Sequence, residues 1–275
     1  MANYTAADVK ALRDRSGAGM MDCKGALDEA DGNVEKALEV LRLKGLKGIT
    51  KREGRTTTNG LIVARVAGGK GYLVELACET DFVAKAANFV ELGEAAGDAI
   101  AAAGATDLDS ALAASAGAKT VNDLITDLAA IIGEKIELRR VTVLADEAVD
   151  AYLHRTSKDL PPQVGVLVAY SGSDAETAHD VAVHIAAYSP NYLTRDEVPA
   201  EIVETERRIA EETARNEGKP EAALAKIVEG RVNGFFKENV LLEQDFAKDN
   251  KLSVAKVLEN AGIKVSAFAR YRVGA

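Results

Sequence analysis

Three histidines and two cysteines are the side chains in this 275-residue chain from which catalytic or metal-binding chemistry would be expected to start. His179 and His184 are five residues apart, which on a helix separates them by about 140° and keeps them from binding one metal ion together. Cys23 and Cys78 lie far apart in the sequence, and neither belongs to a Cys-x-x-Cys pair. The chain also lacks a nucleophile elbow and the glycine fingerprint of dinucleotide-binding folds. We therefore expect no catalytic residues, no metal site and no cofactor, and we do not expect an enzyme.

The segment Gly68-Gly69-Lys70-Gly71 resembles a phosphate-binding loop only in composition. It lacks both the four-residue spacing between glycines and the Ser or Thr after the lysine that a P-loop requires. Acidic pairs such as Glu211-Glu212 lie in a highly charged stretch and are most simply solvated surface charge. No direct nucleotide binding is expected.

The elements that would position a functional side chain are clearest between Lys70 and Val90. Residues 70–78 alternate as a strand does, with Tyr72 and every second residue after it on one face. The period then changes at Thr80, which is suited to cap the N-terminus of a helix. Phe82 and Phe89 recur within that helix at helical spacing, so a strand is predicted to run directly into a helix.

Asp81 and Phe82 lie at the junction of this strand and this helix. In a purely structural interpretation, Asp81 interacts favourably with the helix dipole and Phe82 fills the core. A large aromatic side chain at such a corner can also protrude into a partner protein. Periodicity does not separate the two interpretations, and both stay open at this point.

The segment 75–85, Glu-Leu-Ala-Cys-Glu-Thr-Asp-Phe-Val-Ala-Lys, resembles the central signature of the bacterial elongation factor Ts family. Ala77 departs from it, because the family usually carries Asn there. The resemblance implies a guanine nucleotide exchange factor of translation, whose partner is the GTPase elongation factor Tu. It also implies that one segment intrudes near the partner's nucleotide site and dislodges magnesium. The residues that match this segment are Thr80, Asp81, Phe82 and Val83.

Residues 1–46 are predicted to form three short helices, whose starts carry the capping residues Thr5 and Asn33. The stretch from Leu12 to Leu27 resembles the family's other signature, with Ser16 where Thr is usual. The resemblance implies a bundle similar to ubiquitin-associated (UBA) domains that contacts the partner through Leu12, Met20 and Met21. Burial in the bundle core is an equally open interpretation for Leu12.

The predicted fold class is α+β, with two sheet-plus-helix core subdomains between the bundle and the C-terminus. Residues 47–58 are rich in Lys, Arg and Gly and are predicted to be a basic, flexible linker. Core subdomain N is predicted over 59–145, as a hairpin, helices and a third strand. Core subdomain C is predicted over 146–275, with a similar layout that suggests a divergent internal duplication.

A helical hairpin is predicted to protrude from core subdomain C at about 196–238, because two apolar helical stripes flank the turn at 216–220. With this hairpin and the C-terminal strand, the resemblance covers essentially the whole chain. It implies further contacts with the partner at His154 and in the loop Ile132-Gly133-Glu134, with Ile132 and Gly133 as the candidate contact residues. A simple helix stop at Gly133 and a solvated loop histidine at 154 are the alternatives.

The composition limits what the protein binds and where it works. The chain is 47% hydrophobic and 28% charged, as is ordinary for a soluble protein, and its net charge of -9 argues against a general nucleic-acid or anionic-membrane binder. No apolar run reaches the roughly 20 residues that span a bilayer. The N-terminus has no signal-peptide pattern, and two separate cysteines suit a reducing compartment, so a cytoplasmic location is expected.

Three classes of function are compatible with these observations. Both signatures favour the exchange factor. A UBA-like adaptor or binding module without exchange activity would account for residues 1–46 but would leave the rest of the chain without a role. An enzyme with an unrecognised site is the third class, for which no residues with the required chemistry are found.

Overall fold

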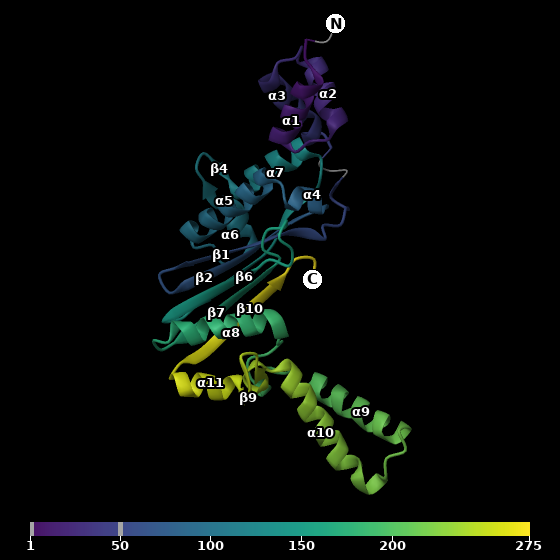
Figure 1. Cartoon of the computed structure of the whole chain (residues 1–275), viewed down its shortest axis with the longest axis vertical. Helices are drawn as coiled ribbons and strands as arrows, with labels where there is room; N and C mark the ends of the chain where they lie inside the picture. Colours follow the sequence, from purple (N-terminus) through teal and green to yellow (C-terminus); the bar gives the residue numbers. More distant parts are fainter. Residues whose placement is uncertain (1–2, 49–51) are drawn as a thin grey trace.

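A computed structural model describes residues 3–48 and 52–275 as an elongated molecule of three parts (Figure 1). A bundle of short helices forms the end that carries the N-terminus, and two small sheets covered by helices form the middle. Two long helices project from the opposite end, and the C-terminus lies near the middle of the molecule. The combination of helices with small antiparallel sheets agrees with the predicted α+β class.

The N-terminal bundle contains the three predicted helices, α1 (Ala6–Ser16), α2 (Met20–Glu29) and α3 (Val34–Leu46). The side chains of Thr5 and Asn33 cap α1 and α3 by accepting hydrogen bonds from backbone N–H groups of the first turn. Leu12, Cys23 and Leu27 are fully buried at the centre of the bundle. The bundle thus has a core of its own, and its likeness to UBA domains stays a prediction.

Core subdomain N contains a three-stranded antiparallel sheet in which the second strand lies between the other two. The helices between the second and third strands cover one face of this sheet. Tyr72, Val74 and Leu76 face those helices and share a buried cluster with Phe89 and Ile100. Its elements are β1 (Asn59–Ala67), β2 (Lys70–Cys78), α4 (Asp81–Ala84), α5 (Ala87–Ala103), α6 (Leu108–Ala113), β3 (Ser115–Ala116), β4 (Lys119–Thr120), α7 (Val121–Ile132) and β5 (Ile136–Ala145).

Core subdomain C repeats this strand order, because β7 lies between β6 and β10 and pairs antiparallel with both. The repeated order supports the predicted internal duplication. The strand β6 and the helix α11 are not predicted from the sequence; in β6 only Val149 is buried, so its alternation is weak. The elements are β6 (Ala148–His154), β7 (Val164–Ser171), α8 (Ala175–Tyr188), η2 (Arg195–Glu197), α9 (Ala200–Asn216), α10 (Glu221–Asn239), η3 (Leu241–Glu243), β8 (Asp245–Phe246), β9 (Asp249–Ser253), α11 (Val254–Ala261) and β10 (Lys264–Arg272).

The two sheets pack face to face through an apolar layer. Two glycines, Gly71 in β2 and Gly165 in β7, occupy equivalent positions in the two central strands. A Cβ atom on Gly71 would overlap side chains of the opposite sheet, and one on Gly165 would overlap Ile62. Glycine is therefore required at both positions for the sheets to approach this closely. The buried residues of this layer include Ile62, Leu73, Val149, Leu167 and Ala169.

The predicted helical hairpin is present and consists of α9 and α10 (Figure 1). Its apolar stripe is buried within the hairpin, in a cluster that includes Val198, Ala210, Val228 and Phe236. This cluster is separate from the one under α8 and α11 in core subdomain C. The hairpin therefore supplies most of its own core.

The prediction of one helix from Thr80 to about Val90 is wrong, because α4 and α5 are separate helices. Between them Ala86 has extended backbone angles, φ −69° and ψ 136°. In one continuous helix Phe82 and Phe89 would share a face, since seven residues make about two turns. The break instead allows Phe89 to be fully buried while Phe82 is 73% exposed.

The predicted basic, flexible linker over 47–58 contacts the core at two points after residue 51, and its flexibility stays a prediction. Thr57 is buried, and Arg52 donates a hydrogen bond to the backbone oxygen of Ala129, 3.1 Å away. Arg52 and Thr57 thus bind polar groups of the core, whereas residues 53–56 and 58 are exposed. Residues 49–51, which belong to the same prediction, lie outside the described residues.

Candidate functional site

The most exposed aromatic side chain near a structural corner is Phe82, in the short helix α4. Its neighbours Val83 and Ala84 are buried and join the core cluster of subdomain N. The same single turn of helix therefore has one residue pair anchored in the core and one large apolar side chain in solvent. We call residues 79–85, which connect β2 to α5, the corner.

Thr80 fixes the start of α4. Its hydroxyl oxygen accepts a hydrogen bond from the Val83 N–H at 3.4 Å, as an N-cap residue does. The same hydroxyl donates to Oε1 of Glu134 at 2.7 Å, and the Thr80 N–H donates to Oε2 of Glu134 at 3.1 Å. The N–H and the hydroxyl group of Thr80 thus make these three hydrogen bonds at the same time.

The Glu79 carboxylate binds in return to the segment that contains Glu134. Its carboxylate accepts a hydrogen bond from the Lys135 N–H at 2.6 Å and another from Arg55 at 3.1 Å. Cys78, the last residue of β2, is buried beside these carboxylates. Burial, together with the charge of Glu134, raises the pKa of the Cys78 thiol to about 12. The thiol is therefore protonated near neutral pH and is not a reactive nucleophile.

Asp81 and Phe82 are both in contact with Lys85 at the end of the corner. The Lys85 ammonium lies 3.1 Å from the Asp81 carboxylate and 4.6 Å from the centre of the Phe82 ring. Exposed contacts of these two kinds contribute only about 0–1 kcal/mol each. Lys85 thus binds Asp81 and Phe82 only weakly, and both side chains are available to a partner.

Met20 and Met21 are exposed at the start of α2, where 46% and 74% of their surfaces face solvent. Their position relative to the corner is fixed by contacts between the bundle and the core. The Asn88 side chain of α5 donates a hydrogen bond to the Ser16 backbone oxygen at 3.1 Å, just before the turn that leads to α2. The helix α3 also lies directly on α7, at Gly45 and Ala130.

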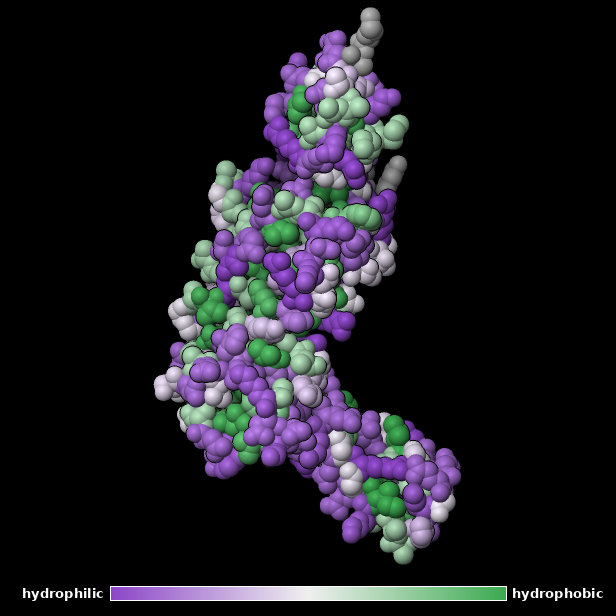
Figure 2. Space-filling model, in the orientation of Figure 1, coloured by the Kyte–Doolittle hydropathy of each residue, from purple (hydrophilic) through white to green (hydrophobic). Residues whose placement is uncertain are grey.

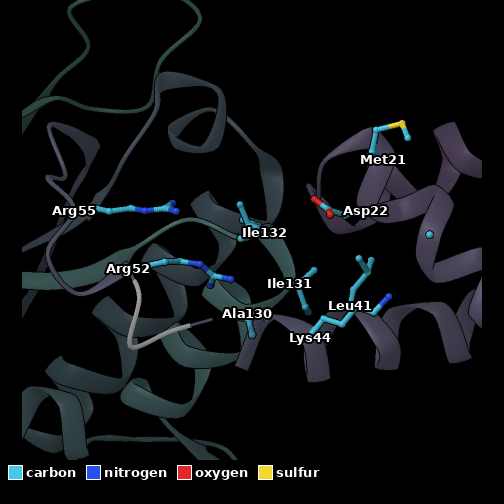
Figure 3. Close-up of a pocket in the computed structure, with 12 residues that line it drawn as sticks. Met21, Asp22, Leu41, Lys44, Arg52, Arg55, Ala130, Ile131 and Ile132 are labelled. Carbon is cyan, nitrogen blue, oxygen red and sulfur yellow. The ribbon is translucent and has the colours of Figure 1, made fainter. Parts of the chain in front are cut away.

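A cleft of about 500 Å³ remains between the bundle and the core (Figure 3). Met21, Asp22, Leu41 and Lys44 border it on the bundle side, and Arg52, Arg55 and the end of α7 border it on the other. Its cationic residues already have partners, since Lys44 pairs with Glu29 and Arg55 with Glu79. The cleft is thus explained by how the bundle packs on the core.

Three of the residues expected to contact a partner are buried. Leu12 has no exposed surface, so of its two interpretations the structure shows the core position. Val83 and Ile132 are also buried, and both belong to the cluster of core subdomain N. Gly133 ends α7 with a positive φ of 86°, and it directly precedes Glu134.

His154 ends β6 and is exposed, at the edge of core subdomain C. Its Nδ1 atom lies 3.0 Å from the Tyr152 hydroxyl. The neighbouring residues Leu153 and Arg155 border a second cleft, of about 390 Å³, whose other wall includes Lys85 of the corner. His154 therefore belongs to a segment that approaches the corner from the other subdomain.

Among residues 3–48 and 52–275, no group of three or more His, Cys, Asp or Glu side chains is arranged to hold a metal ion. Within the same part of the chain, no helix is both long and apolar enough to cross a membrane. One face of the molecule, in Figure 2, is largely hydrophilic with scattered apolar areas, one of them on the projecting helices.

The sequence does not predict that Glu134 and Lys135 bind the corner, although the family resemblance places Glu134 in a loop expected to contact the partner. Glu134 and Lys135 are more than fifty positions away from Thr80 and Glu79, so no local spacing connects them. The available signal is the pairing of the strands: Cys78 lies opposite Ile136 in the sheet, which places the residues just beyond each strand end together. Lys85, by contrast, is four residues after Asp81 and follows from helical spacing.

Comparison with known proteins identifies the family to which the chain is similar. A family model described as Elongation factor TS matches residues 79–275, from the first residue of the corner to the end of the chain. The chain is 63% identical over 278 positions to an elongation factor Ts of Renibacterium salmoninarum, with all of both chains covered. Proteins with this name from Micrococcus luteus and Arthrobacter sp. are 61% and 60% identical over 277 positions, again with all of both chains covered.

Proposed function

The chain belongs to the elongation factor Ts family of translation elongation factors, and from this premise we propose how it promotes nucleotide exchange on the GTPase elongation factor Tu. Asp81 and Phe82 enter the partner near its nucleotide site and dislodge the magnesium ion. GDP then leaves, and GTP is loaded in its place. The observation that carries this proposal is the exposed Phe82 ring on a corner whose backbone is held by buried residues and by Glu134.

Phe82 supplies the binding free energy that holds the partner in a displaced arrangement. Transfer of a phenylalanine side chain from water into an apolar site is worth about 1.5–3 kcal/mol. Little of this is lost to ordering, because Val83 and Ala84 already fix α4 in the free protein. The side chain therefore acts as a preformed wedge.

The magnesium ion is a sensitive target for such a wedge. It requires near-octahedral oxygen ligands at about 2.0–2.1 Å, so a small displacement of one ligand weakens its binding sharply. Asp81 adds a negative charge close to the metal and the phosphates. Its ion pair with Lys85 is half exposed and contributes little, so Asp81 can exchange this partner for groups of the GTPase.

Release of the factor follows from thermodynamic linkage. A factor that weakens GDP binding must itself be bound more weakly, by the same ratio, when GDP is present. Binding of GTP then expels the factor and returns it for another cycle. The exchange requires no covalent step, so this chain needs no catalytic side chain for it.

The other expected partner contacts fit this proposal to different degrees. Met20 and Met21 are exposed and flexible, which suits an adaptable contact surface. Gly133 and His154 lie at the surface beside the corner and its neighbouring cleft. Leu12, Val83 and Ile132 are buried, and in this proposal they support the contact surface by packing behind it.

The proposal is tested by mixing the protein with elongation factor Tu that carries fluorescent GDP, at saturating magnesium and again with excess chelator. We expect fast GDP release in magnesium and a much smaller acceleration after chelation, because the chelator has already removed the ion. An acceleration of equal size in both conditions would contradict the magnesium mechanism. Binding without any acceleration would instead identify a UBA-like adaptor.

A further inference from the structure

We propose that Glu134 is a positioning residue of the exchange site: it holds Thr80 and thereby sets the direction in which α4 presents Asp81 and Phe82. This inference rests on the proposed function, since it assigns a further residue to the same site. Glu134 lies in the connection between α7 and β5 and is not adjacent to the corner in the sequence.

The hydrogen bonds determine the orientation of the Thr80 side chain completely. Its hydroxyl hydrogen points to Oε1 of Glu134, at 2.7 Å, which leaves an oxygen lone pair directed at the Val83 N–H. The second carboxylate oxygen accepts the Thr80 N–H at 3.1 Å. A bidentate carboxylate thus fixes both the backbone and the side chain of the residue that begins α4.

Glu79 strengthens this arrangement from the other strand. Its carboxylate accepts the Lys135 N–H at 2.6 Å, so each of the two chain segments sends one carboxylate to the backbone of the other. We call these contacts of Glu79 and Glu134 the brace. It continues the pairing of β2 with β5 beyond the last paired residues, Cys78 and Ile136.

The equivalent place in core subdomain C shows that this fold does not require a brace. There the connection from α11 to β10 is Gly262-Ile263, which contains no carboxylate. The segment after β7 approaches it closely instead: a Cβ atom on Gly172 would lie 2.8 Å from the Gly262 oxygen. In core subdomain C the Gly172 N–H donates to Oε2 of Glu147 at 3.2 Å, a carboxylate from the turn before β6. The arrangement in which the segment before the third strand sends a carboxylate to the start of a helix is thus particular to the corner of core subdomain N.

The brace also joins the two proposed contact surfaces. Glu134 lies two residues after the end of α7, the helix on which α3 of the bundle lies at Gly45 and Ala130. Met20 and Met21 belong to that bundle, and Phe82 belongs to the corner. Both surfaces are thus connected to α7: the bundle through the packing of α3 on α7, and the corner through the hydrogen bonds of Glu134.

The test compares catalysed GDP release by the wild-type protein and by Glu134→Gln and Glu134→Ala, each at saturating factor. We expect Glu134→Ala to slow release by about 10- to 100-fold, because small misplacements of a site residue cost this much. Glu134→Gln retains one acceptor oxygen and should lose less. Thermal unfolding of each variant shows that it is folded.

Asp123→Asn is a matched control on the other end of α7. Asp123 accepts hydrogen bonds from the N–H and hydroxyl of Thr120, at 2.9 and 2.8 Å, which is the same combination that Glu134 accepts from Thr80. We expect this variant to release GDP at the wild-type rate. If all three carboxylate variants slow release equally, or none does, Glu134 has no positioning role.

The Phe82→Ala background separates this inference from the proposed function. If Glu134 acts through the corner, Glu134→Ala should cause little further loss once Phe82 is absent. A full additional loss in that background would assign Glu134 to a different contact and overturn the inference. If Phe82→Ala alone leaves exchange intact, the proposed function fails; if only the Glu134 variants are silent, the positioning inference alone fails.

Discussion

The two core subdomains share one strand order but turn from sheet to helix in different ways. In subdomain C, three residues after β7 lead directly into α8, and Asp174 caps that helix by accepting the Thr177 N–H at 3.0 Å. In subdomain N, the chain forms the extra helix α4, breaks at Ala86 and only then begins α5. The extra turn carries Phe82 into solvent.

This difference distinguishes the structural features that the fold requires from those that are available for function. A three-stranded sheet covered by a helix forms in subdomain C without an extra turn or a brace. The corner of subdomain N is therefore not a requirement of folding, and its exposed aromatic side chain is available for binding. The same reasoning applies to the helical hairpin, which is inserted only in subdomain C. The parts that distinguish the two halves are the first candidates for contact with a partner.

The largest effect is expected from Phe82→Ala, compared with Phe89→Ala. Loss of about 1.5–3 kcal/mol of burial in the partner should slow catalysed GDP release by about 10- to 100-fold. The melting temperature should hardly change, because the ring is 73% exposed. Stopped-flow release of fluorescent GDP and thermal unfolding measure the two quantities.

Phe89→Ala is the matched control, since it removes the same side chain seven residues later. Phe89 is fully buried, so this variant should lose about 3–5 kcal/mol of unfolding free energy. The two phenylalanines should thus separate function from stability. A Phe82→Ala protein that melts many degrees lower would show that the ring is a core residue in solution.

Much of this architecture is predictable because local sequence patterns determine it. The strands β1, β2, β5, β7 and β10 follow from alternation and turn residues, and the three bundle helices follow from capping residues and spacing. The break at Ala86 is not predictable in this way, because no proline or glycine marks it. It arises from tertiary packing, which draws Val83 and Phe89 into one cluster.

The central residues of the candidate site are predictable from the sequence, whereas the residues that hold them in place are not. The resemblance of residues 75–85 to a family signature identifies Asp81 and Phe82. Glu134 and Lys135 hold the corner through contacts across more than fifty positions of the chain, and their residue types alone suggest ordinary solvated side chains. Leu12, an apolar residue within the other signature, is fully buried, and its contact with the partner stays a prediction.

A smaller effect is expected from Gly45→Ala, which tests how firmly the bundle is attached to subdomain N. A Cβ atom at Gly45 would overlap the backbone carbonyl of Ala130, so α3 must shift on α7 at a cost of about 1–3 kcal/mol. We expect affinity for nucleotide-free elongation factor Tu to fall by about tenfold as Met20 and Met21 move. Titration with the labelled GTPase measures this affinity.

Gly25→Ala is the control for that variant. It makes the same change within α2, but a Cβ atom there would have no neighbour within 4 Å. Its affinity should equal that of the wild type, and its stability should be equal or slightly higher, because alanine favours a helix. If Gly45→Ala binds as tightly as Gly25→Ala, the position of the bundle on α7 does not matter for binding.

A modest effect of pH is expected in subdomain C alone, because all three histidines lie there. His184 is buried; its Nδ1 accepts the Ala247 N–H at 3.2 Å, so Nε2–H donates to Gln244 at 2.8 Å. Burial lowers the pKa of His184 below its ordinary value of 6.5, and the hydrogen bond to Gln244 opposes this only in part.

The sign of the pH effect follows from proton binding. As pH falls through about 6.5, the unfolded chain takes up a proton that the folded chain does not, so the free energy of unfolding decreases. Between pH 7.5 and 5.5 the melting temperature should drop by a few degrees. His184→Gln should remove most of this drop, whereas His179→Gln, an exposed histidine on the same helix, should keep it. An unchanged drop in His184→Gln would assign the acid sensitivity to other groups.

The smallest effect on the core is expected from removal of the hairpin, with a short Gly-Ser turn in place of residues 201–235. The cluster that buries the apolar residues of the hairpin is separate from the cluster of the sheet in subdomain C, although Tyr192, Val198 and Val240 at its base also belong to it, so both sheets and the helices on them keep their contacts. Leu258→Ala in α11, a single substitution inside the cluster of subdomain C, should cost about 2–5 kcal/mol. The main thermal transition should therefore move less when 35 residues of the hairpin are deleted than when one core leucine is truncated. The reverse order would mean that the arm is a structural part of subdomain C, and the two halves would then differ in how they fold as well as in what they present.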